Sequence, residues 1–376
     1  MTAQDIKLPY KRIVTKFGTS LLTGGSDHLD SAVMSNLVRQ LAELHVAGTE
    51  LAVVTSGAVA CGRHKLGFPK IKDIPVKQVL SSVGQSHLMY TYENLFNHYD
   101  INIAQALLTR AVLVDRAGYL NARNTLLALV ELGVISIINE NDVVATDEIQ
   151  GAKFGDNDNL SAMVANLIDA DLLIILSDIS GLYTADPGVN SQAQLIPEVT
   201  RVDDKIFALA GGSRGGLGTG GMTTKLQAAK MATACGITVI IAKGTEPDVM
   251  LRLAKGEQIG TRFLPTANKL ESRERWMLAG LSVKGKLVVD EGASGALNRQ
   301  HSSLLGAGII QVEGNFGRGD MVDLFDTLGN RLGSGITNYG AEDINKIKGL
   351  HSEKIHGLLG YDYGSEVIHR NNLVII

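Results

Sequence analysis

The chain has 376 residues, of which 45% are hydrophobic and 20% charged, and its formal net charge is -4 at pH 7. This length suits one large domain or two domains, and the composition is that of a globular protein with a full core. The slightly acidic balance gives no electrostatic reason to expect nucleic-acid binding, and no apolar run approaches the length of a membrane span.

The use of cysteine favours a reducing, cytoplasmic location. Cys61 and Cys235 stand far apart in no metal or redox spacing, so we expect two small core side chains rather than a disulfide. Residues 1–11 are polar and lack the apolar core of a signal peptide. The nine histidines are scattered and show no His-x-x-x-His metal spacing.

Short apolar runs alternate with longer helical patterns up to about residue 245. The predicted strands are Arg12–Thr15, Leu51–Val54, Ile101–Leu107, Val134–Ile138, Leu172–Leu176 and Ile237–Ile241. The predicted helices are Ser31–Ala47, Lys77–Tyr99, Asn121–Leu132, Asn159–Ala170 and Thr224–Cys235. This order predicts an α/β fold, a three-layer αβα sandwich around a mainly parallel sheet, with ligands bound beyond the carboxyl ends of the strands.

Small and polar residues follow the first two predicted strands. Lys16, followed by Gly18 and two hydroxyl side chains, can place its ammonium on a phosphate, although a solvated lysine at a turn is the commoner case. After the second strand, Ser56 offers a hydroxyl and Gly57 permits close approach of the backbone to a ligand. Close packing of a helix on the sheet would require the same small residues, so both interpretations stay open.

Two further polar clusters lie near the middle of the chain. Residues 139–142, Asn-Glu-Asn-Asp, suit recognition of the amino and carboxylate groups of a small polar substrate, or a turn. Asp156 and Asp158 flank Asn157 directly before an apolar helix. One aspartate would suffice as an N-cap, so this density of charge favours a site; the calcium-loop pattern is absent.

Two other segments have less specific interpretations. Asn121 to Asn124 are expected to open a helix as an N-cap cluster with a structural role. The loop from Ser177 to Pro187 follows a buried strand and includes Asp178. It could border a nucleotide, although a plain surface loop is the default.

The glycine-rich stretch 211–225 is the most informative part of the chain. Seven of the eleven residues from 211 to 221 are glycine, and the stretch ends in Thr223, Thr224 and Lys225 before a helical pattern. Glycines and a helix N-terminus can bind an anion through backbone N–H groups, and a lysine adds a mobile charge. A flexible linker is the alternative, but the Thr-Thr-Lys ending favours a phosphate loop that is not of the Walker type.

The pattern changes in the last third of the chain. Residues 255–275 are polar and predict a connector. Short strands with intervening glycines follow at Lys286–Val289, Ile309–Val312, Met321–Phe325 and Arg331–Ser334. They predict a small barrel-like β domain.

Taken together, these motifs resemble the glutamate 5-kinases of the amino acid kinase family. The resemblance rests on the segments 16–20, 54–58, 139–142, 155–159, 181–187 and 218–225. Segments 139–142 and 155–159 are the most specific of these, and segments 289–293 and 314–320 resemble a PUA domain. The implied organisation is an amino acid kinase domain over 1–265, a linker over 266–281 and a PUA domain over 282–376.

The resemblance implies transfer of phosphate from ATP, with Mg²⁺, to the γ-carboxylate of L-glutamate, the first step of proline biosynthesis. Lys16 and Lys225 would bind the phosphates and stabilise the transferring group, and Asp158 would orient both. Glutamate would be held by Ser56, Asp142 and Asn157. ATP would be held by Lys16, Ser177, Asp178, Thr219, Gly220, Gly221, Met222, Thr223, Thr224 and Lys225. Position 177 is commonly threonine in relatives, and serine keeps the hydroxyl; no residue is singled out as a metal ligand.

The resemblance also implies feedback inhibition by proline and a homotetrameric or homodimeric assembly. Because the acyl phosphate product is labile, hand-over to glutamate-5-semialdehyde dehydrogenase is a reasonable hypothesis.

Acetylglutamate kinases, aspartokinases and uridylate kinases share the glycine-rich phosphate sites, but segments 139–142 and 155–159 and the β tail count against them. RNA binding by the tail is disfavoured because residues 282–376 show no dense Lys/Arg cluster, and a catalytically silent regulator is disfavoured by Lys16, Asp158 and Lys225.

Overall fold

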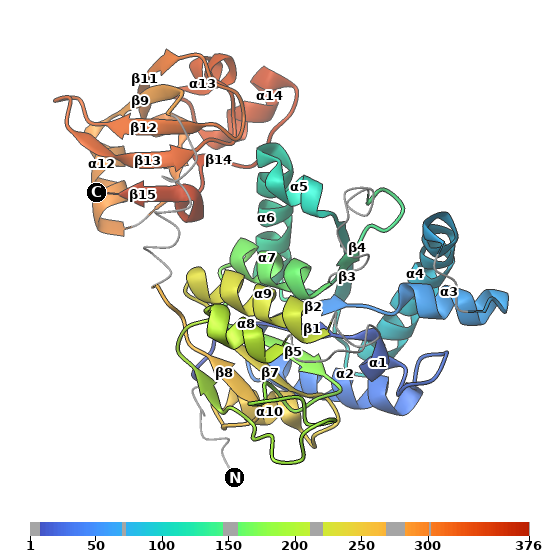
Figure 1. Cartoon of the computed structure of the whole chain (residues 1–376). Coiled ribbons are helices and arrows are strands. Elements are labelled where there is room, and N and C mark those ends of the chain that lie inside the picture. The colour runs from blue at the N-terminus through green and yellow to red at the C-terminus, as the bar shows by residue number, and fades with distance from the viewer. Residues whose placement is uncertain are drawn as a thin grey trace, which may run out of the picture. The chain divides into compact units, whose positions relative to one another are not determined.

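A computed structural model of the chain forms two compact units, residues 1–114 with 122–269 and residues 115–121 with 270–376. It describes residues 8–69, 73–145, 157–210, 221–267, 283–300 and 302–375 (Figure 1). The first unit is built on a large sheet covered by helices and the second on a smaller sheet. The predicted order of an α/β fold followed by a β-rich tail is therefore confirmed.

The sheet of the first unit has eight strands in the order β3-β4-β2-β1-β5-β7-β8-β6. The strands are β1 Arg12–Phe17, β2 Glu50–Thr55, β3 Ile103–Leu108, β4 Ile135–Glu140, β5 Leu172–Ser177, β6 Glu198–Val199, β7 Thr238–Lys243 and β8 Thr261–Phe263. Neighbouring strands are parallel except β7 and β8, which are antiparallel. All six predicted strands are present, and the two that were not foreseen are short strands at one edge.

Helices cover both faces of this sheet, with α2 and α10 on one face and α7 and α9 on the other (Figure 1). The helices are α1 Thr19–Leu22, α2 Ser31–Val46, α3 Ala58–Leu66, α4 Ile74–Asn97, α5 Arg110–Val114, α6 Arg116–Glu131, α7 Asn157–Leu167, α8 Asp204–Ala210, α9 Gly221–Ala234 and α10 Val249–Ala254. The three-layer arrangement follows from strands that are apolar on both sides and must be buried on both.

The alternation of side chains along β1 sends Lys16 to the α7–α9 face. Ile13 and Phe17 are fully buried in the core that includes Leu37 and Leu41 of α2. Successive strand residues point to opposite faces, so Lys16, next to Phe17, points toward α7 and α9. The hydrophobic pattern of β1 thus determines that the Lys16 side chain lies on the face of the sheet that α7 and α9 cover.

Two glycines let α3 and α4 cross in backbone contact. A Cβ atom at Gly62 would lie 1.8 Å from the carbonyl oxygen of Leu80, and one at Gly84 would lie 1.8 Å from that of Ala58. No side chain larger than hydrogen fits at either position without moving a helix. The contact at Gly62 joins two helices, whereas the close packing expected after β2 was of a helix on the sheet, so that interpretation stays open.

The N-terminus of α6 differs from the sequence-based expectation. The helix begins at Arg116, and the N–H of Gly118 donates to Oδ2 of Asp115 at 2.8 Å. The expected N-cap role of Asn121 is thus wrong, because Asp115 already caps the helix and Asn121 lies within it. Arg123 donates to Asp169 at 2.6 Å and to the carbonyl of Leu167, which is the structural role expected of this cluster.

The second unit contains a five-stranded sheet in the order β11-β9-β12-β13-β15 and a β10–β14 pair. Its strands are β9 Gly285–Val289, β10 Leu304–Leu305, β11 Ile309–Gly314, β12 Met321–Phe325, β13 Arg331–Ile336, β14 Glu366–Ile368 and β15 Leu373–Ile375. Its helices include α12 Glu291–Gln300, α13 Ala341–Ile347 and α14 Ile355–Leu359, and its core includes Leu287, Val322, Leu324, Ile344 and Ile347. The four predicted strands are present, whereas the three helices were not foreseen.

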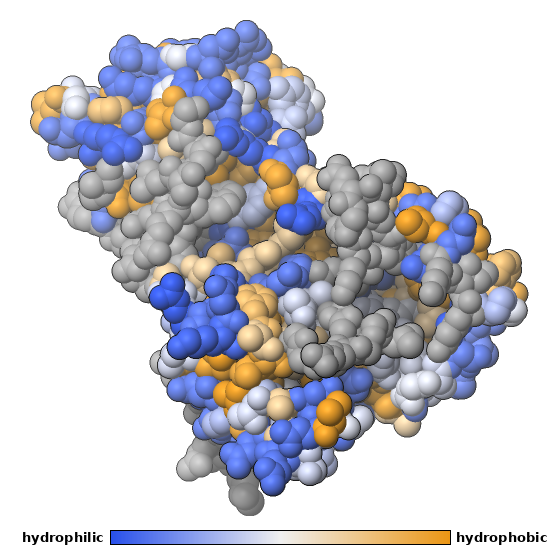
Figure 2. Space-filling view, in the orientation of Figure 1, coloured by the Kyte–Doolittle hydropathy of each residue, from blue (hydrophilic) through white to orange (hydrophobic). Residues whose placement is uncertain are grey.

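The surface seen in Figure 2 mixes hydrophilic residues with smaller hydrophobic areas. Within the described ranges, none of the helices is long and apolar enough to cross a membrane.

Candidate functional site

Polar side chains from four strands meet at the carboxyl edge of the large sheet. Lys16 lies in β1, Ser56 directly follows β2, Asn139 lies near the end of β4 and Ser177 ends β5. Neighbouring parallel strands all end at this edge, and α7 and α9 start beside it. The sheet topology therefore gathers motifs that are more than a hundred residues apart in the sequence.

Asp158 joins two buried lysines at the centre of this edge. Its Oδ1 lies 2.7 Å from Nζ of Lys16, and its Oδ2 lies 3.1 Å from Nζ of Lys225 and 2.8 Å from the hydroxyl of Thr224. Asp158 is 4% exposed, Lys16 6% and Lys225 8%. One carboxylate thus holds a lysine from β1 and a lysine from α9 in fixed positions.

The charge of this carboxylate is set by opposing effects. Burial alone would raise the pKa of Asp158, but the charges of Lys16 and Lys225, aided by hydrogen bonds from Lys16 and Thr224, outweigh it and hold the pKa below its ordinary value. Asp158 is therefore ionised at neutral pH. A buried cluster of two cations and one anion leaves an excess positive charge, which suits an anionic ligand.

Asn157, the residue before Asp158, lines a cleft of about 400 Å³ with polar walls. It is lined by Thr19, Ser20, Thr23, Gly25, Ser26, Ser56, Gly57, Ala58, Val59, Ala60, Arg63, Lys77, Asn139, Asp142 and Asn157. The side-chain amide of Asn157 donates to Oγ of Ser56 and the carbonyl of Thr55, both at 2.9 Å, and to Oδ1 of Asn139 at 3.1 Å. Asn157 thereby ties the ends of β2 and β4 to the start of α7.

Asp142 supplies an acidic group to the same cleft. It is 6% exposed, its Oδ2 accepts a hydrogen bond from the hydroxyl of Ser81, and its carbonyl accepts one from Gln78 at 2.9 Å. Burial raises the pKa of Asp142 above its ordinary value, and the hydrogen bond from Ser81 partly offsets this. A buried carboxylate that lines a polar cleft is suited, in its ionised form, to binding a cationic group.

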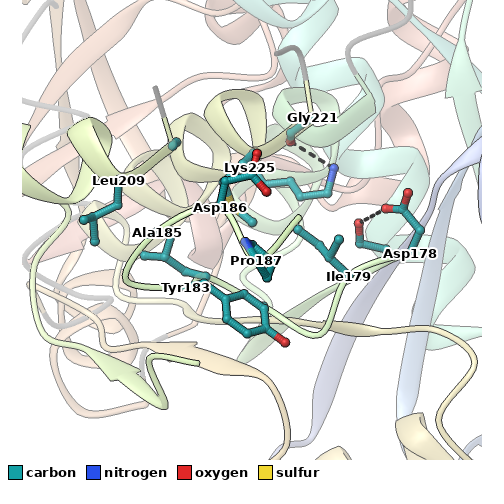
Figure 3. Close-up of a pocket in the computed structure, with 14 residues that line it drawn as sticks. Asp178, Ile179, Tyr183, Ala185, Asp186, Pro187, Leu209, Gly221 and Lys225 are labelled. Carbon is teal, nitrogen blue, oxygen red and sulfur yellow. Dashed lines mark hydrogen bonds between the residues drawn. The ribbon is translucent and has the colours of Figure 1, made fainter. Parts of the chain in front are cut away.

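A second cleft, of about 270 Å³, has Lys225 in its lining (Figure 3). It is lined by Ser177, Asp178, Ile179, Gly181, Leu182, Tyr183, Ala185, Asp186, Pro187, Leu209, Ala210, Gly221, Met222 and Lys225. Figure 3 shows the dashed bond from Lys225 to the carbonyl of Gly221, at 3.0 Å, and that from Ser177 to Asp178, at 2.9 Å. Apolar and polar walls together suit a ligand with a flat ring and a charged end.

The structure brings together most of the residues that the sequence singled out. Lys16, Asp158 and Lys225 are in contact, and Ser56, Asp142 and Asn157 line the first cleft. The predicted nucleotide residues Ser177, Asp178, Gly221, Met222 and Lys225 line the second cleft, and Thr223 and Thr224 lie in the first turn of α9. Thr219, Gly220 and Asp156 lie outside the described residues.

Sequence reasoning missed the contribution of α4. Gln78 and Ser81 bind Asp142, and Oε1 of Gln85 accepts a hydrogen bond from Asn139 at 2.8 Å. These three polar residues recur at helical spacing, but α4 also carries polar residues such as His87 on its other faces. No stripe in the sequence therefore marked the face that contacts the site.

Comparisons with known proteins give matches to two family models and to several named relatives. The model of the amino acid kinase family matches residues 11–243, and that of the PUA domain matches residues 285–359. A protein named glutamate 5-kinase from Dehalococcoides mccartyi (strain CBDB1) is 59% identical over 98% of this chain and 99% of its own length. One of the same name from Herpetosiphon aurantiacus is 51% identical over 97% and 98%. The solved UMP kinase from Bacillus anthracis matches with 17% identity and a TM-score of 0.48, over 69% of this chain and 98% of its own chain. This likeness is too distant to bear on the substrate.

Proposed function

Because this chain belongs to the amino acid kinase family, we propose that it phosphorylates the γ-carboxylate of L-glutamate with ATP, the first step of proline biosynthesis. The products are ADP and L-glutamyl 5-phosphate. The substrate comes from the names of relatives that share half or more of this chain's residues over nearly its whole length.

The observation that carries this proposal is the Lys16–Asp158–Lys225 cluster between two clefts. A reaction between two anions needs fixed positive charge at the point where they meet. Lys225 lines the 270 Å³ cleft, and Asn157, next to Asp158 in the sequence, lines the 400 Å³ cleft. In this proposal, a phosphate from the cleft at Lys225 meets a carboxylate from the cleft at Asn157, beside the two lysines.

The acceptor cleft offers complementary groups for an amino acid. Asp142 would bind the α-amino group, because it is the buried carboxylate of that cleft. Ser56 and Asn157 would bind carboxylate oxygens and direct the γ-carboxylate toward the lysines. Held in this way, the acceptor has the in-line position that phosphoryl transfer requires.

The second cleft would hold the nucleotide. Ser177 and Asp178 would bind the nucleoside end, and the first turn of α9 from Gly221 to Lys225 would face the phosphates, with Thr219 and Gly220 before it. The free N–H groups of a helix N-terminus and a buried lysine fit a polyphosphate. Magnesium, when bound, would help to neutralise the charge that develops on the transferring phosphoryl group.

The site needs no general base for this reaction. The γ-carboxylate of glutamate has a pKa of about 4.3 in water, so it is ionised at pH 7 and can attack phosphorus directly. Its oxygen forms a bond to the γ-phosphorus while the bond to the β–γ bridging oxygen breaks and ADP leaves. Lys16 and Lys225 stabilise the charge on the transferring group, and Asp158 keeps both in place.

Further properties of the family are part of the proposal. They comprise inhibition by proline, assembly into a homodimer or homotetramer, and hand-over of the labile product to glutamate-5-semialdehyde dehydrogenase. The domain limits that we propose are 1–265 for the kinase, 266–281 for the linker and 282–376 for the PUA domain. Residues 268–282 lie outside the described part of the chain, so the linker rests on composition alone.

An acceptor panel tests the proposal. ADP release from magnesium-ATP is measured with L-glutamate, L-aspartate, N-acetylglutamate and UMP offered separately, and hydroxylamine traps any acyl phosphate. We expect a signal with glutamate alone, and a lower one when proline is added. Activity confined to another acceptor would overturn the substrate, and near-normal turnover in Lys225→Ala would overturn the site.

A further inference from the structure

Outside the clefts, an exposed cluster of metal-binding side chains joins the loop after α1 to the end of α3. Asp27 and His28 lie in the loop between α1 and α2, and His64 lies in the last turn of α3. Nδ1 of His28 lies 3.0 Å from Oδ1 of Asp27, and Nδ1 of His64 lies 3.9 Å from the same oxygen. The two imidazole rings are 5.2 Å apart, centroid to centroid.

The spacing of these groups fits a small transition-metal ion. One ligand atom from each of the three residues lies within 4.8 Å of the other two. Zinc takes nitrogen and oxygen ligands at about 2.0 to 2.2 Å in tetrahedral geometry, which places neighbouring ligand atoms roughly 3.3 to 3.6 Å apart. The two nitrogen-to-oxygen distances here are 3.0 and 3.9 Å, and small rotamer changes of these exposed side chains would bring them to the tetrahedral separation.

The loop that carries Asp27 and His28 is already fixed by its own hydrogen bonds. The hydroxyl of Ser26 donates to the carbonyl of Thr23 at 2.6 Å and lies 2.9 Å from that of His28. The N–H of Asp30 donates to the carbonyl of Leu22 at 2.8 Å, and its side chain caps α2. A metal would therefore find two of its ligands on an ordered turn, which lowers the entropy lost on binding.

From these distances we propose that Asp27, His28 and His64 form a binding site for one zinc-like divalent ion. Two imidazoles with one carboxylate are a donor set typical of zinc, and a fourth position remains for water. The site lies apart from the lysine cluster and takes no part in phosphate transfer. Its ion fastens the loop to α3, and both elements line the acceptor cleft through Ser26 and Arg63.

Zinc binding to the full-length chain tests this proposal. After dialysis against a chelator, the nucleotide-free protein is titrated with ZnCl₂ by calorimetry and with Co²⁺ by visible spectroscopy, which reports imidazole coordination. The variants are His28→Ala and His64→Ala. His356→Ala is the matched control, because His356 lies 3.6 Å from Asp362 in an exposed pair that has no second imidazole within it.

We expect one equivalent of zinc per chain and at least tenfold weaker binding in His28→Ala and in His64→Ala, with His356→Ala unchanged. Zinc should also slow amide hydrogen exchange in residues 23–30 of the unmodified chain. No uptake, uptake that survives both variants, or uptake without slower exchange would each overturn the proposal.

Discussion

Replacing Asp158 with asparagine should show how much the charge of this residue contributes to the stability of the fold and how much it contributes to catalysis. The asparagine side chain would keep the shape and an oxygen for the hydroxyl of Thr224, but it would lack the charge that holds Lys16 and Lys225. At an effective dielectric constant of about 20, each contact, at 2.7 and 3.1 Å, represents an attraction of about 5 to 6 kcal/mol. Desolvation cancels much of this, so we expect the free energy of unfolding to fall by about 3 kcal/mol.

The effect on turnover should be larger than the effect on nucleotide binding. Losing the alignment of charged groups at a transferring phosphate typically lowers kcat by about 100- to 1,000-fold. The KM for ATP should change less than tenfold, because the polyphosphate can itself pair with the freed lysines. Initial rates with saturating glutamate give kcat and KM, and urea unfolding of wild type and variant gives the stability difference.

The pH dependence of stability provides an independent check. Because the pKa of Asp158 is below its ordinary 3.8 in the folded protein, its contribution is complete above that pH and lost only as the pH falls through the folded value. The stability difference between wild type and Asp158→Asn should thus be constant near neutrality and shrink below about pH 4. A variant that keeps both wild-type kcat and wild-type stability would refute the role assigned to Asp158.

Three further predictions concern the acceptor cleft and the helices behind it. If the ionised form of Asp142 binds glutamate, kcat/KM for glutamate should fall on acidification at a pH above 3.8. Ser81→Ala should move the acidic limb of the pH–rate profile to higher pH, because it removes a hydrogen bond that lowers the pKa of Asp142. An acidic limb that does not move would contradict this prediction. Gln85→Leu leaves a buried amide without its partner, so we expect the KM for glutamate to rise about tenfold while kcat stays within about threefold; steady-state kinetics showing the reverse would count against it. Gly62→Ala should lower the free energy of unfolding in a denaturation assay by about 1 to 3 kcal/mol, because its Cβ would meet a backbone oxygen at 1.8 Å. Gly357→Ala is the control: a Cβ there would have nothing within 4 Å, so it should be neutral or stabilising in the same assay.

The sequence predicted the large sheet well because its strands are covered on both faces. Strands such as Leu172–Ser177 are buried at every position, so they appear as continuous apolar runs that no surface helix would show. The short edge strands β6 and β8 lacked such a run. The start of α6 was misplaced because Asn121 resembles a cap, while the cap that forms is Asp115, six residues earlier.

Site residues at the ends of strands could be predicted from the sequence, whereas site residues on the face of a helix could not. Lys16, Ser56 and Asp142 each follow or end an apolar run, so their position in the sheet indicates their place in the site. Gln85 sits in the middle of a helix, and only the fold reveals its partner Asn139 at the end of β4. His28 and His64 are likewise brought together by the fold, with no spacing in the sequence to mark them.

Isotope transfer from the acceptor tests the proposed phosphorylation of glutamate most directly. L-Glutamate carrying two ¹⁸O atoms in its γ-carboxylate is incubated with magnesium-ATP and hydroxylamine, and the released inorganic phosphate is analysed by mass spectrometry. If the γ-carboxylate attacks phosphorus, each phosphate released with hydroxamate carries one ¹⁸O atom, because hydroxylamine breaks the bond between carbon and the bridging oxygen. Phosphate without label would show that water, not glutamate, accepts the phosphoryl group.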